Sequence, residues 1–324
     1  MKHVKLSRLR ALVPKFKGKK ILVVGDIMID DYIWGNVSRI SPEAPIPVVE
    51  VYKEESKPGG AANVMLNLVE LGAKVYAAGV VGADANAHKL EKDLKKRGIS
   101  TEGIIEDRKR PTTVKTRVIA HQQQVVRIDR EKKVLLSEAI KERLIEKAVR
   151  IAKRVDAVIF SDYNKGVLIW ETVEKITAAA RGKIISVDPK PANIKIFRNA
   201  TIITPNRKEA AEGTGIDIKT EDDIRRAAAN LRETLNAEAV MITRGEDGMS
   251  LYDGVSLETI PTVAREVYDV TGAGDTVVST VTLALAAGAS FAEAAVLSNF
   301  AAGISVREVG VVTVKPQQLL KEIK

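Results

Sequence analysis

The sequence has 324 residues, 45% of them hydrophobic, so it can bury one large α/β core or two average ones. It contains no cysteine, which excludes disulfides, thiolate zinc sites and cysteine nucleophiles. It shows no signal-peptide pattern and no apolar run of about 18 residues. We therefore expect a soluble, cytoplasmic protein without a membrane partner.

The formal net charge of +9 admits a nucleic-acid ligand, but the distribution of the charges argues against one. Lys and Arg alternate with Asp and Glu along predicted helices such as residues 137–154, as on ordinary solvated faces. Aromatic residues make up only 4% of the chain and do not lie among basic clusters, so a stacking platform for single strands is missing. The charge favours small anionic ligands, and we expect no nucleic-acid partner.

Apolar runs typical of buried parallel strands recur along the chain. They fall at residues 20–26, 74–79, 157–161, 183–188, 200–204 and 239–243. Helical patterns lie between most of them, and Ser137 and Thr220 are predicted to cap two of these helices. The alternation predicts a single α/β domain over residues 1–324, with a mainly parallel sheet covered on both faces and ligands at the carboxyl ends of its strands.

Two segments interrupt this alternation. Residues 32–52 contain three prolines followed by a valine-rich stretch, and residues 111–129 alternate β-branched with polar side chains. We expect both segments to form a small separate sheet that covers the strand ends as a lid. Because valines fall on both faces of these strands, one face is predicted to cover the ligand and the other to pair with a second copy in a homodimer.

The segment 268–276 places a carboxylate directly after three small residues that open a helix. The backbone N–H groups of Gly272, Ala273 and Gly274 can surround a negative oxygen at the positive end of that helix. Asp275 can then accept a proton from an attacking hydroxyl while the N–H groups stabilise a transferring phosphoryl group. The alternative is a glycine-rich turn whose Asp caps a helix.

Several polar residues follow predicted strands or open predicted helices, where a sugar phosphate would bind. Carboxylates and an amide in the first part of the chain are candidate partners of sugar hydroxyls, beside a glycine pair that lets a ligand approach the backbone. Two lysines later in the chain are candidate phosphate ligands, and another carboxylate lies beside the first of them. These predicted substrate-binding residues are Asp26, Asp30, Gly59, Gly60, Asn63, Asp162, Lys165 and Lys190. Helix caps, solvated turns and surface lysines remain the structural alternatives.

Asn206 and Glu209 stand one helical turn apart after the strand predicted at 200–204. Glu209 could orient water around a magnesium ion that also contacts phosphates. The alternative is an N-cap with its partner at the third helical position. The sequence contains no G-x-x-x-x-G-K-S/T loop, no G-x-G-x-x-G and no H-E-x-x-H motif, and its three histidines are widely separated.

Three motifs in this order and spacing resemble those of the ribokinase-like carbohydrate kinases, the PfkB family: Gly-Gly-Ala-Ala-Asn, Asn-x-x-Glu and Asp-Val-Thr-Gly-Ala-Gly-Asp. The resemblance implies a three-layer α/β/α fold with a small β-sheet lid, Asp275 as catalytic base, and residues 272–274 as an anion hole. It implies that Asn206 and Glu209 organise magnesium and phosphate. Further implied roles are a nucleotide pocket at Thr243, Gly245 and Asn299, and a monovalent-cation site, such as one for K⁺, at Asp269 and Thr271.

Residues 38–49, together with Ser161-Asp162-Tyr163 and Thr204-Pro205-Asn206, resemble the kinases that form the first half of the bacterial ADP-heptose synthesis enzymes. This resemblance implies an ATP- and Mg²⁺-dependent phosphorylation of C1 of D-glycero-β-D-manno-heptose 7-phosphate, a step toward lipopolysaccharide. The His-x-Gly-His motif of the nucleotidyltransferase half is missing, so we expect that activity on a separate protein. The open alternatives are a kinase for fructose 6-phosphate or ribose, and a catalytically silent sugar-binding or regulatory protein.

Overall fold

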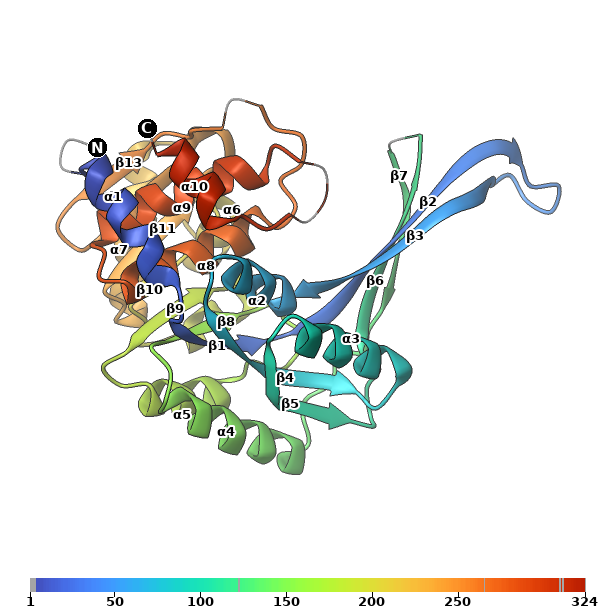
Figure 1. Ribbon diagram of the computed structural model, residues 1–324, viewed down its shortest axis with the longest axis horizontal. Helices are drawn as coiled ribbons and strands as arrows, with labels where there is room; N and C mark the ends of the chain where they lie inside the picture. The colour runs from blue at the N-terminus through green and yellow to red at the C-terminus, as the bar shows by residue number, and fades with distance from the viewer. Residues whose placement is uncertain (1–3, 122, 265, 309, 311, 324) are drawn as a thin grey trace.

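A computed structural model describes residues 4–121, 123–264, 266–308, 310 and 312–323. Its centre is a nine-stranded sheet in the order β13-β12-β11-β10-β9-β8-β1-β4-β5 (Figure 1). The paired strands from β11 to β5 are parallel, and β12 and β13 add an antiparallel edge. The strands are β1 (Lys20–Gly25), β4 (Lys74–Gly82), β5 (Ser100–Asp107), β8 (Ala157–Ser161), β9 (Ile184–Asp188), β10 (Ile202–Ile203), β11 (Ala239–Thr243), β12 (Met249–Tyr252) and β13 (Leu257–Ile260).

Helices cover both faces of this sheet and give the predicted three layers. One face packs against α1 (Leu6–Leu12), η1 (Val13–Phe16), α2 (Ala61–Glu70), α3 (Ala85–Lys96), α8 (Ala273–Ala286), α9 (Phe291–Ser305) and α10 (Pro316–Glu322). The other packs against α4 (Glu138–Ala152), α5 (Trp170–Ala179), η2 (Pro191–Ile196), α6 (Arg207–Thr214) and α7 (Glu221–Leu235). A short turn, η3 (Gly245–Asp247), follows β11.

Strand β1 shows why an unbroken apolar run marks the centre of such a sheet. Ile21 and Val23 belong to the core on the α8 side, whereas Leu22 and Val24 belong to the core on the α4 side. Side chains of a strand alternate between faces, so a strand covered on both sides needs an apolar residue at every position. All four side chains are fully buried.

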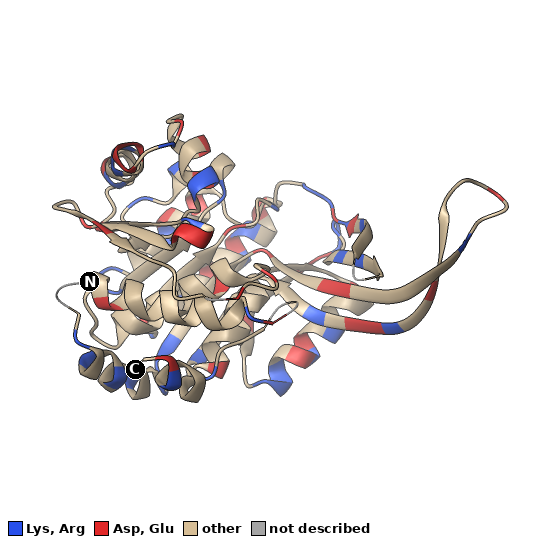
Figure 2. Cartoon of the chain, turned by 90° about the horizontal axis from the view of Figure 1, so that it is seen from above, with Lys and Arg blue, Asp and Glu red and all other residues tan. Residues whose placement is uncertain are grey.

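The small sheet consists of four strands in the order β3-β2-β6-β7: β2 (Ile27–Ile40), β3 (Pro47–Gly60), β6 (Thr113–Ala120) and β7 (Gln123–Arg130). It projects from the central domain as a long ribbon that carries both acidic and basic residues (Figures 1 and 2). Residues 32–52, predicted to belong to this sheet, lie within β2, β3 and the turn between them, and the two strands extend beyond that range to residues 27 and 60. The chain passes from β1 through Asp26 straight into β2, and residues 41–46, with Pro42 and Pro45, form the turn of a hairpin.

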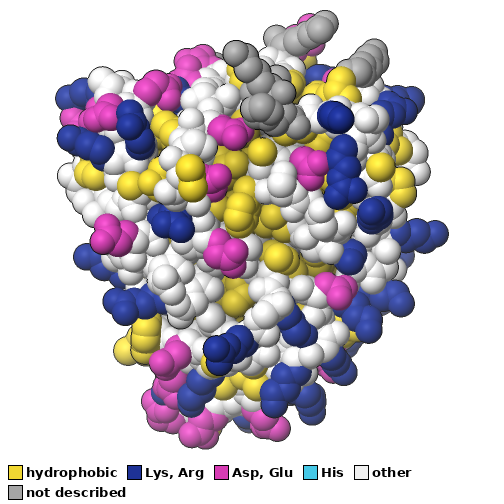
Figure 3. All heavy atoms as spheres, turned by 90° about the vertical axis from the view of Figure 1, so that its left-hand side faces the viewer, with side chains coloured by type: hydrophobic (Ala, Val, Ile, Leu, Met, Phe, Trp, Pro, Cys, Tyr) yellow, Lys and Arg dark blue, Asp and Glu magenta, His cyan; other side chains and the backbone are white. Residues whose placement is uncertain are grey.

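Charge is mixed on the face that lies opposite the small sheet. Figure 3 shows Lys and Arg interspersed there with Asp and Glu around a strip of hydrophobic side chains. This face therefore lacks the continuous basic patch that a phosphate backbone would require. Within the described residues, no helix is both long and apolar enough to span a bilayer.

Candidate active site

The predicted site residues meet at the carboxyl ends of the parallel strands, where α8 begins. Gly272 is the N-cap of α8 and has φ of 80°, a left-handed conformation that glycine adopts without strain. Asp275 lies in the first turn, so its carboxylate is close to the positive end of the helix. A Cβ atom added to Gly274 would meet nothing within 4 Å, so the backbone here faces open space. A ligand can approach it.

Two side chains hold the Asp275 carboxylate. The Asn63 amide donates to Oδ2 at 2.6 Å, and the Tyr163 hydroxyl donates to Oδ1 at 2.8 Å. Burial raises the pKa of Asp275 to about 6, although the hydrogen bonds from Asn63 and Tyr163 act in the opposite direction. A carboxylate with such a pKa is ionised at neutral pH and is a stronger base than an exposed one. Our sequence reasoning gave Tyr163 no role, because nothing local links it to Asp275.

The glycine pair before α2 allows strand β3 to pass close to the Asp30 carboxylate and to the Asp26 backbone. A Cβ atom at Gly59 would lie 2.0 Å from Asp30 Oδ2, and one at Gly60 would lie 2.6 Å from the Asp26 carbonyl oxygen. Gly60 also has φ of 57° and serves as the N-cap of α2. The pair therefore places Asn63, one turn into the helix, beside Asp275. The Oδ1 atom of Asn63 is buried and has no hydrogen-bond partner among the described residues.

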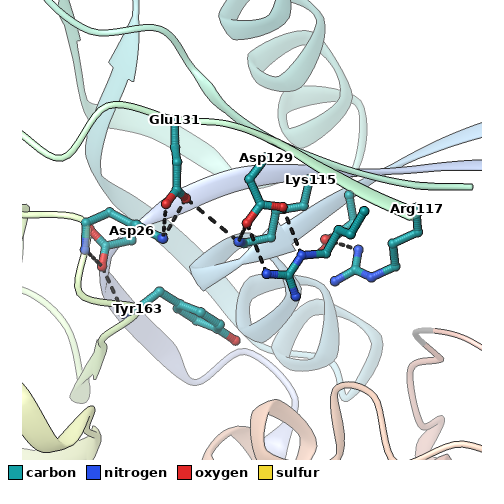
Figure 4. Close-up of polar contacts among 9 residues, drawn as sticks. Asp26, Lys115, Arg117, Asp129, Glu131 and Tyr163 are labelled. Carbon is teal, nitrogen blue, oxygen red and sulfur yellow. Dashed lines mark hydrogen bonds and ion pairs between the residues drawn. The ribbon is translucent and has the colours of Figure 1, made fainter. Parts of the chain in front are cut away.

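Ion pairs tie the small sheet to the loop that follows β8 (Figure 4). The Arg117 guanidinium donates to Asp30 at 2.5 Å, and the Lys165 ammonium donates to Glu131 at 2.7 Å. Lys115 bridges Asp129 at 3.0 Å and Glu131 at 3.7 Å. We call these residues, Asp30, Lys115, Arg117, Asp129, Glu131 and Lys165, the ionic cluster. Of these, sequence reasoning identified only Asp30 and Lys165.

Two predicted sugar-binding carboxylates lie inside the protein and hold loops. Asp26 accepts backbone N–H groups of Tyr163, Lys165 and Val167 at 2.9, 3.1 and 3.3 Å. Asp162 is fully buried and accepts from the backbone of Asn164 and Lys190 and from the Asn193 side chain. Burial raises the pKa of both carboxyls, that of Asp26 to about 6. Direct contact of either residue with a sugar stays a prediction.

Asn206 and Glu209 form a reciprocal capping box at the start of α6. Asn206 Oδ1 accepts the Glu209 N–H and Glu209 Oε2 accepts the Asn206 N–H, both at 2.9 Å. The second Glu209 oxygen pairs with Lys190, whose ammonium lies 5.6 Å from the Tyr163 ring centroid. The alternative we considered, a helix cap, is thus present together with a charged contact that reaches the site. Asp188 lies next to this pair, and burial raises its pKa well above the usual range.

A cavity of about 130 Å³ connects Asp275 with this pair. It is lined by Tyr163, Asp188, Lys190, Thr204, Asn206, Glu209, Thr243, Gly272, Gly274 and Asp275. The Lys190 ammonium, the side-chain oxygens and the backbone N–H groups at the N-terminus of α8 are together suited to bind a polyphosphate with a hard divalent ion. No cluster of three or more metal-ligating side chains was found among the described residues. Glu209 lines this cavity, and its predicted role of holding such an ion through water stays a prediction.

A larger cavity of about 590 Å³ adjoins the smaller one, and Thr243 and Gly274 line both. Thr243, Gly245 and Asn299 line it, and most of its remaining walls are small or apolar, including Val270, Ala273, Val277, Ala302, Gly303 and Val306. The Asn299 amide donates to the Pro261 carbonyl at 2.7 Å and so braces the wall. The size and lining suit a flat base with its ribose. A further cavity of about 670 Å³ lies beside Trp170 and Arg198, and none of the predicted site residues lines it.

Asp269 and Thr271, the predicted monovalent-cation residues, lie in the loop before α8. Asp269 accepts the backbone N–H of Thr271 at 2.8 Å and that of Gly310 at 2.9 Å. Burial opposes ionisation of this carboxyl, but the hydrogen bonds outweigh it and its pKa lies below the ordinary value. The loop is therefore tied down around an ionised Asp269. A cation there stays a prediction.

Comparison with known proteins identifies the family. The model of the pfkB family carbohydrate kinases matches residues 18–318. The chain belongs to this family. Among curated proteins of related sequence, one named Bifunctional protein HldE from Geotalea uraniireducens is 46% identical over 321 residues, and one of the same name from Desulfatibacillum aliphaticivorans is 47% identical over 315.

These relatives are longer than this family member. The alignments cover 98% and 96% of this chain but 65% and 64% of theirs. Two solved structures share the ribokinase-like fold: Escherichia coli phosphofructokinase-2 in complex with potassium, and Arabidopsis thaliana ribokinase complexed with ribose and ATP. Their TM-scores are 0.79 and 0.75 at 20% and 18% identity, and the alignments cover 94% and 95% of this chain and 98% and 99% of theirs.

Proposed function

We propose that this PfkB-family chain transfers the γ-phosphoryl group of ATP to the C1 hydroxyl of D-glycero-β-D-manno-heptose 7-phosphate. The observation that carries a kinase reaction is the buried Asp275, which Asn63 and Tyr163 hold at the wall of the smaller cavity, next to Gly274, a residue that lines both cavities. The choice of sugar rests on the motif resemblance of residues 38–49 and on the identity to relatives named HldE.

In the proposed reaction, Asp275 accepts the proton of the C1 hydroxyl as its oxygen attacks the γ-phosphorus and ADP leaves. The N–H groups of residues 272–274 face the transferring group, and Lys190 adds positive charge beside it. A bound Mg²⁺ would neutralise phosphate charge, and Asn206 and Glu209 would organise its water shell. The small sheet would exclude water, which is a competing nucleophile.

The test is a screen of the purified chain with ATP against heptose 7-phosphate, fructose 6-phosphate, ribose and water alone, with the product detected by mass spectrometry. We expect a heptose 1,7-bisphosphate and little ATP hydrolysis without sugar. A different phosphorylated sugar would replace the proposed substrate and keep the kinase reaction. Release of inorganic phosphate without any sugar product would contradict the kinase reaction itself.

The small sheet also supports the proposed homodimer. All eight residues of β7 are exposed, and Val125, Val126 and Ile128 place apolar surface there, while Val114 and Val118 of β6 are buried on the inner side. Light scattering at micromolar concentration should show twice the 35.2 kDa chain mass, reduced to a monomer by Val126→Glu but not by the control Val255→Glu. A monomeric wild-type chain would reject the dimer.

A cytoplasmic location, a separate nucleotidyltransferase partner and K⁺ dependence stay predictions. Activity measured in K⁺ and in Na⁺ buffers tests the last of these. We expect higher turnover in K⁺, because Asp269 and its loop lie directly before the helix that carries Asp275.

A further inference from the structure

Among the described residues, Tyr163 hydrogen-bonds both to the buried carboxylate of Asp26, between β1 and β2, and to Asp275, the predicted base. Its hydroxyl donates to Asp275 Oδ1 at 2.8 Å, and its backbone N–H donates to Asp26 Oδ2 at 2.9 Å. Figure 4 shows the side chain extending away from Asp26. Neither contact was expected from the sequence, and the family motifs quoted above assign no role to this residue.

The position of the Tyr163 ring is fixed from two directions. Asp26, which is 2% exposed, accepts backbone N–H groups from the Tyr163, Lys165 and Val167 positions and so fastens the loop that carries the ring. On the other side, the Lys190 ammonium lies 5.6 Å from the ring centroid. A side chain held in this way presents its hydroxyl in one place, which is what a precise contact with a reacting group requires.

We propose that Tyr163 is a positioning residue that fixes the orientation of the Asp275 carboxylate for accepting the sugar proton. The inference rests on the proposed role of Asp275 as the base. With Asn63 on one oxygen and Tyr163 on the other, both carboxylate oxygens have a fixed donor. The plane of the carboxylate is thereby set, and the remaining lone pairs are left for the substrate hydroxyl.

Other charges also act on Asp275. Lys190, from the loop after β9, lowers the pKa of Asp275, and Asp30 of β2 raises it. Asp188, at the end of β9, is a further carboxylate that interacts electrostatically with Asp275. Glu209 of α6 pairs with Lys190. Burial and the neighbouring Asp275 raise the pKa of the Tyr163 hydroxyl well above its usual range, so the hydroxyl keeps its proton and stays a donor.

Replacing Tyr163 with Phe removes only the hydroxyl and leaves all of these charges in place. The lost hydrogen bond stabilised the ionised carboxylate, so its removal raises the pKa of Asp275. We expect the acidic limb of the pH profile of kcat/KM to move up by about one pH unit and kcat near pH 8 to fall roughly tenfold. Tyr76→Phe, the same change near the amino end of β4 and away from the carboxyl ends of the strands, should move neither quantity.

A second measurement does not depend on turnover. The carboxyl ¹³C signal of Asp275, assigned by its loss in Asp275→Asn, can be titrated by NMR in the wild-type chain and in Tyr163→Phe. A higher pKa of Asp275 in Tyr163→Phe supports the positioning contact even if no sugar in the panel is phosphorylated. An unchanged pKa overturns it, as does a loss of activity without any displacement of the acidic limb, because a merely structural role produces that result.

Discussion

The two sides of Asp275 are lined by different kinds of side chain. On the side of the small sheet, the ionic cluster joins β2, β6, β7 and the loop after β8 through ion pairs whose side chains are 10–25% exposed. On the side of the larger cavity, most of the walls are small or apolar, with Arg244 and Glu246 as the charged exceptions, and Asn299 donates to a backbone carbonyl. A ligand on the first side would meet charged groups and hydrogen-bond donors, whereas a ligand on the second side would mainly meet apolar walls that fit its outline.

The difference predicts how each side recognises its ligand. Buried ion pairs are sensitive to the loss of one partner, because the other charge is left without compensation in a poorly hydrated place. An apolar wall tolerates changes of charge nearby and is sensitive to changes of volume. Substitutions on the two sides of Asp275 should therefore separate the binding of the sugar from the binding of the nucleotide.

The largest effect is expected where the two sides meet. Asp275→Asn removes the base and keeps the size of the side chain, so kcat should fall by at least ~10²-fold while the affinities for both ligands change little. Steady-state kinetics and calorimetric titration with a non-hydrolysable ATP analogue measure this. A variant that retained more than a tenth of the wild-type turnover would refute the assignment of Asp275 as the base.

One substitution on each side of Asp275 tests whether sugar and nucleotide bind separately. Arg117→Met leaves Asp30 buried without its partner, so KM for the sugar should rise by roughly tenfold with KM for ATP unchanged. Ala302→Leu narrows the larger cavity and should raise KM for ATP instead. Arg154→Met, which removes an exposed ion pair with Glu102, is the control. Equal changes in both KM values for either site variant would contradict the division.

A smaller effect is expected at the phosphate side of the site. Glu209→Gln keeps the capping box, because Gln is also favoured at that position, but removes the charge that pairs with Lys190. The magnesium concentration for half-maximal activity should rise several-fold, on the order of 3–10, with KM for the sugar unchanged. Activity is measured against magnesium concentration for the wild type and for Glu209→Gln. Identical curves would mean that Glu209 serves only as part of the helix cap.

The smallest effect is on stability. Burial raises the pKa of Asp275 from 3.8 in the unfolded chain to about 6 in the folded protein. The contribution of Asp275 to the free energy of unfolding is therefore most favourable below pH 3.8 and is lost as the pH rises through about 6. Asp275→Asn removes this titration, so at pH 8 the variant should be more stable than the wild type by about 1–3 kcal/mol, a few degrees in Tm. The difference should shrink toward pH 4.

The exposed Asp217→Asn serves as the matched control for that measurement and should show no such pH trend. Asp26 contributes equally to both proteins and cancels in the difference. Thermal unfolding followed by circular dichroism at pH 4, 6 and 8 gives the result. A pH-independent difference would mean that Asp275 does not carry the titration.

Much of the fold could be predicted because its signals are local. The runs at 157–161 and 239–243 match β8 and β11 residue for residue, since a strand covered on both faces must be apolar throughout. Thr220 caps α7 in a capping box with Asp223, as its sequence position indicated, whereas Ser137 occupies the N-cap of α4 without a capping hydrogen bond from its side chain. The strands β5, β12 and β13 were missed. The edge strands β5 and β13 are less uniformly apolar, and β12, which lies between β13 and β11, is only four residues long.

By itself the sequence determined where most of the central parallel strands lie and where α8 presents Asp275, because apolar periodicity and helix-start signals act over a few residues. Only the tertiary structure decided which side chains surround that carboxylate. Tyr163 reaches Asp275 across 112 residues of sequence, and Arg117 reaches Asp30 across 87. Such partners depend on which strand ends lie side by side, and that order is set by the packing of the whole sheet rather than by any local pattern.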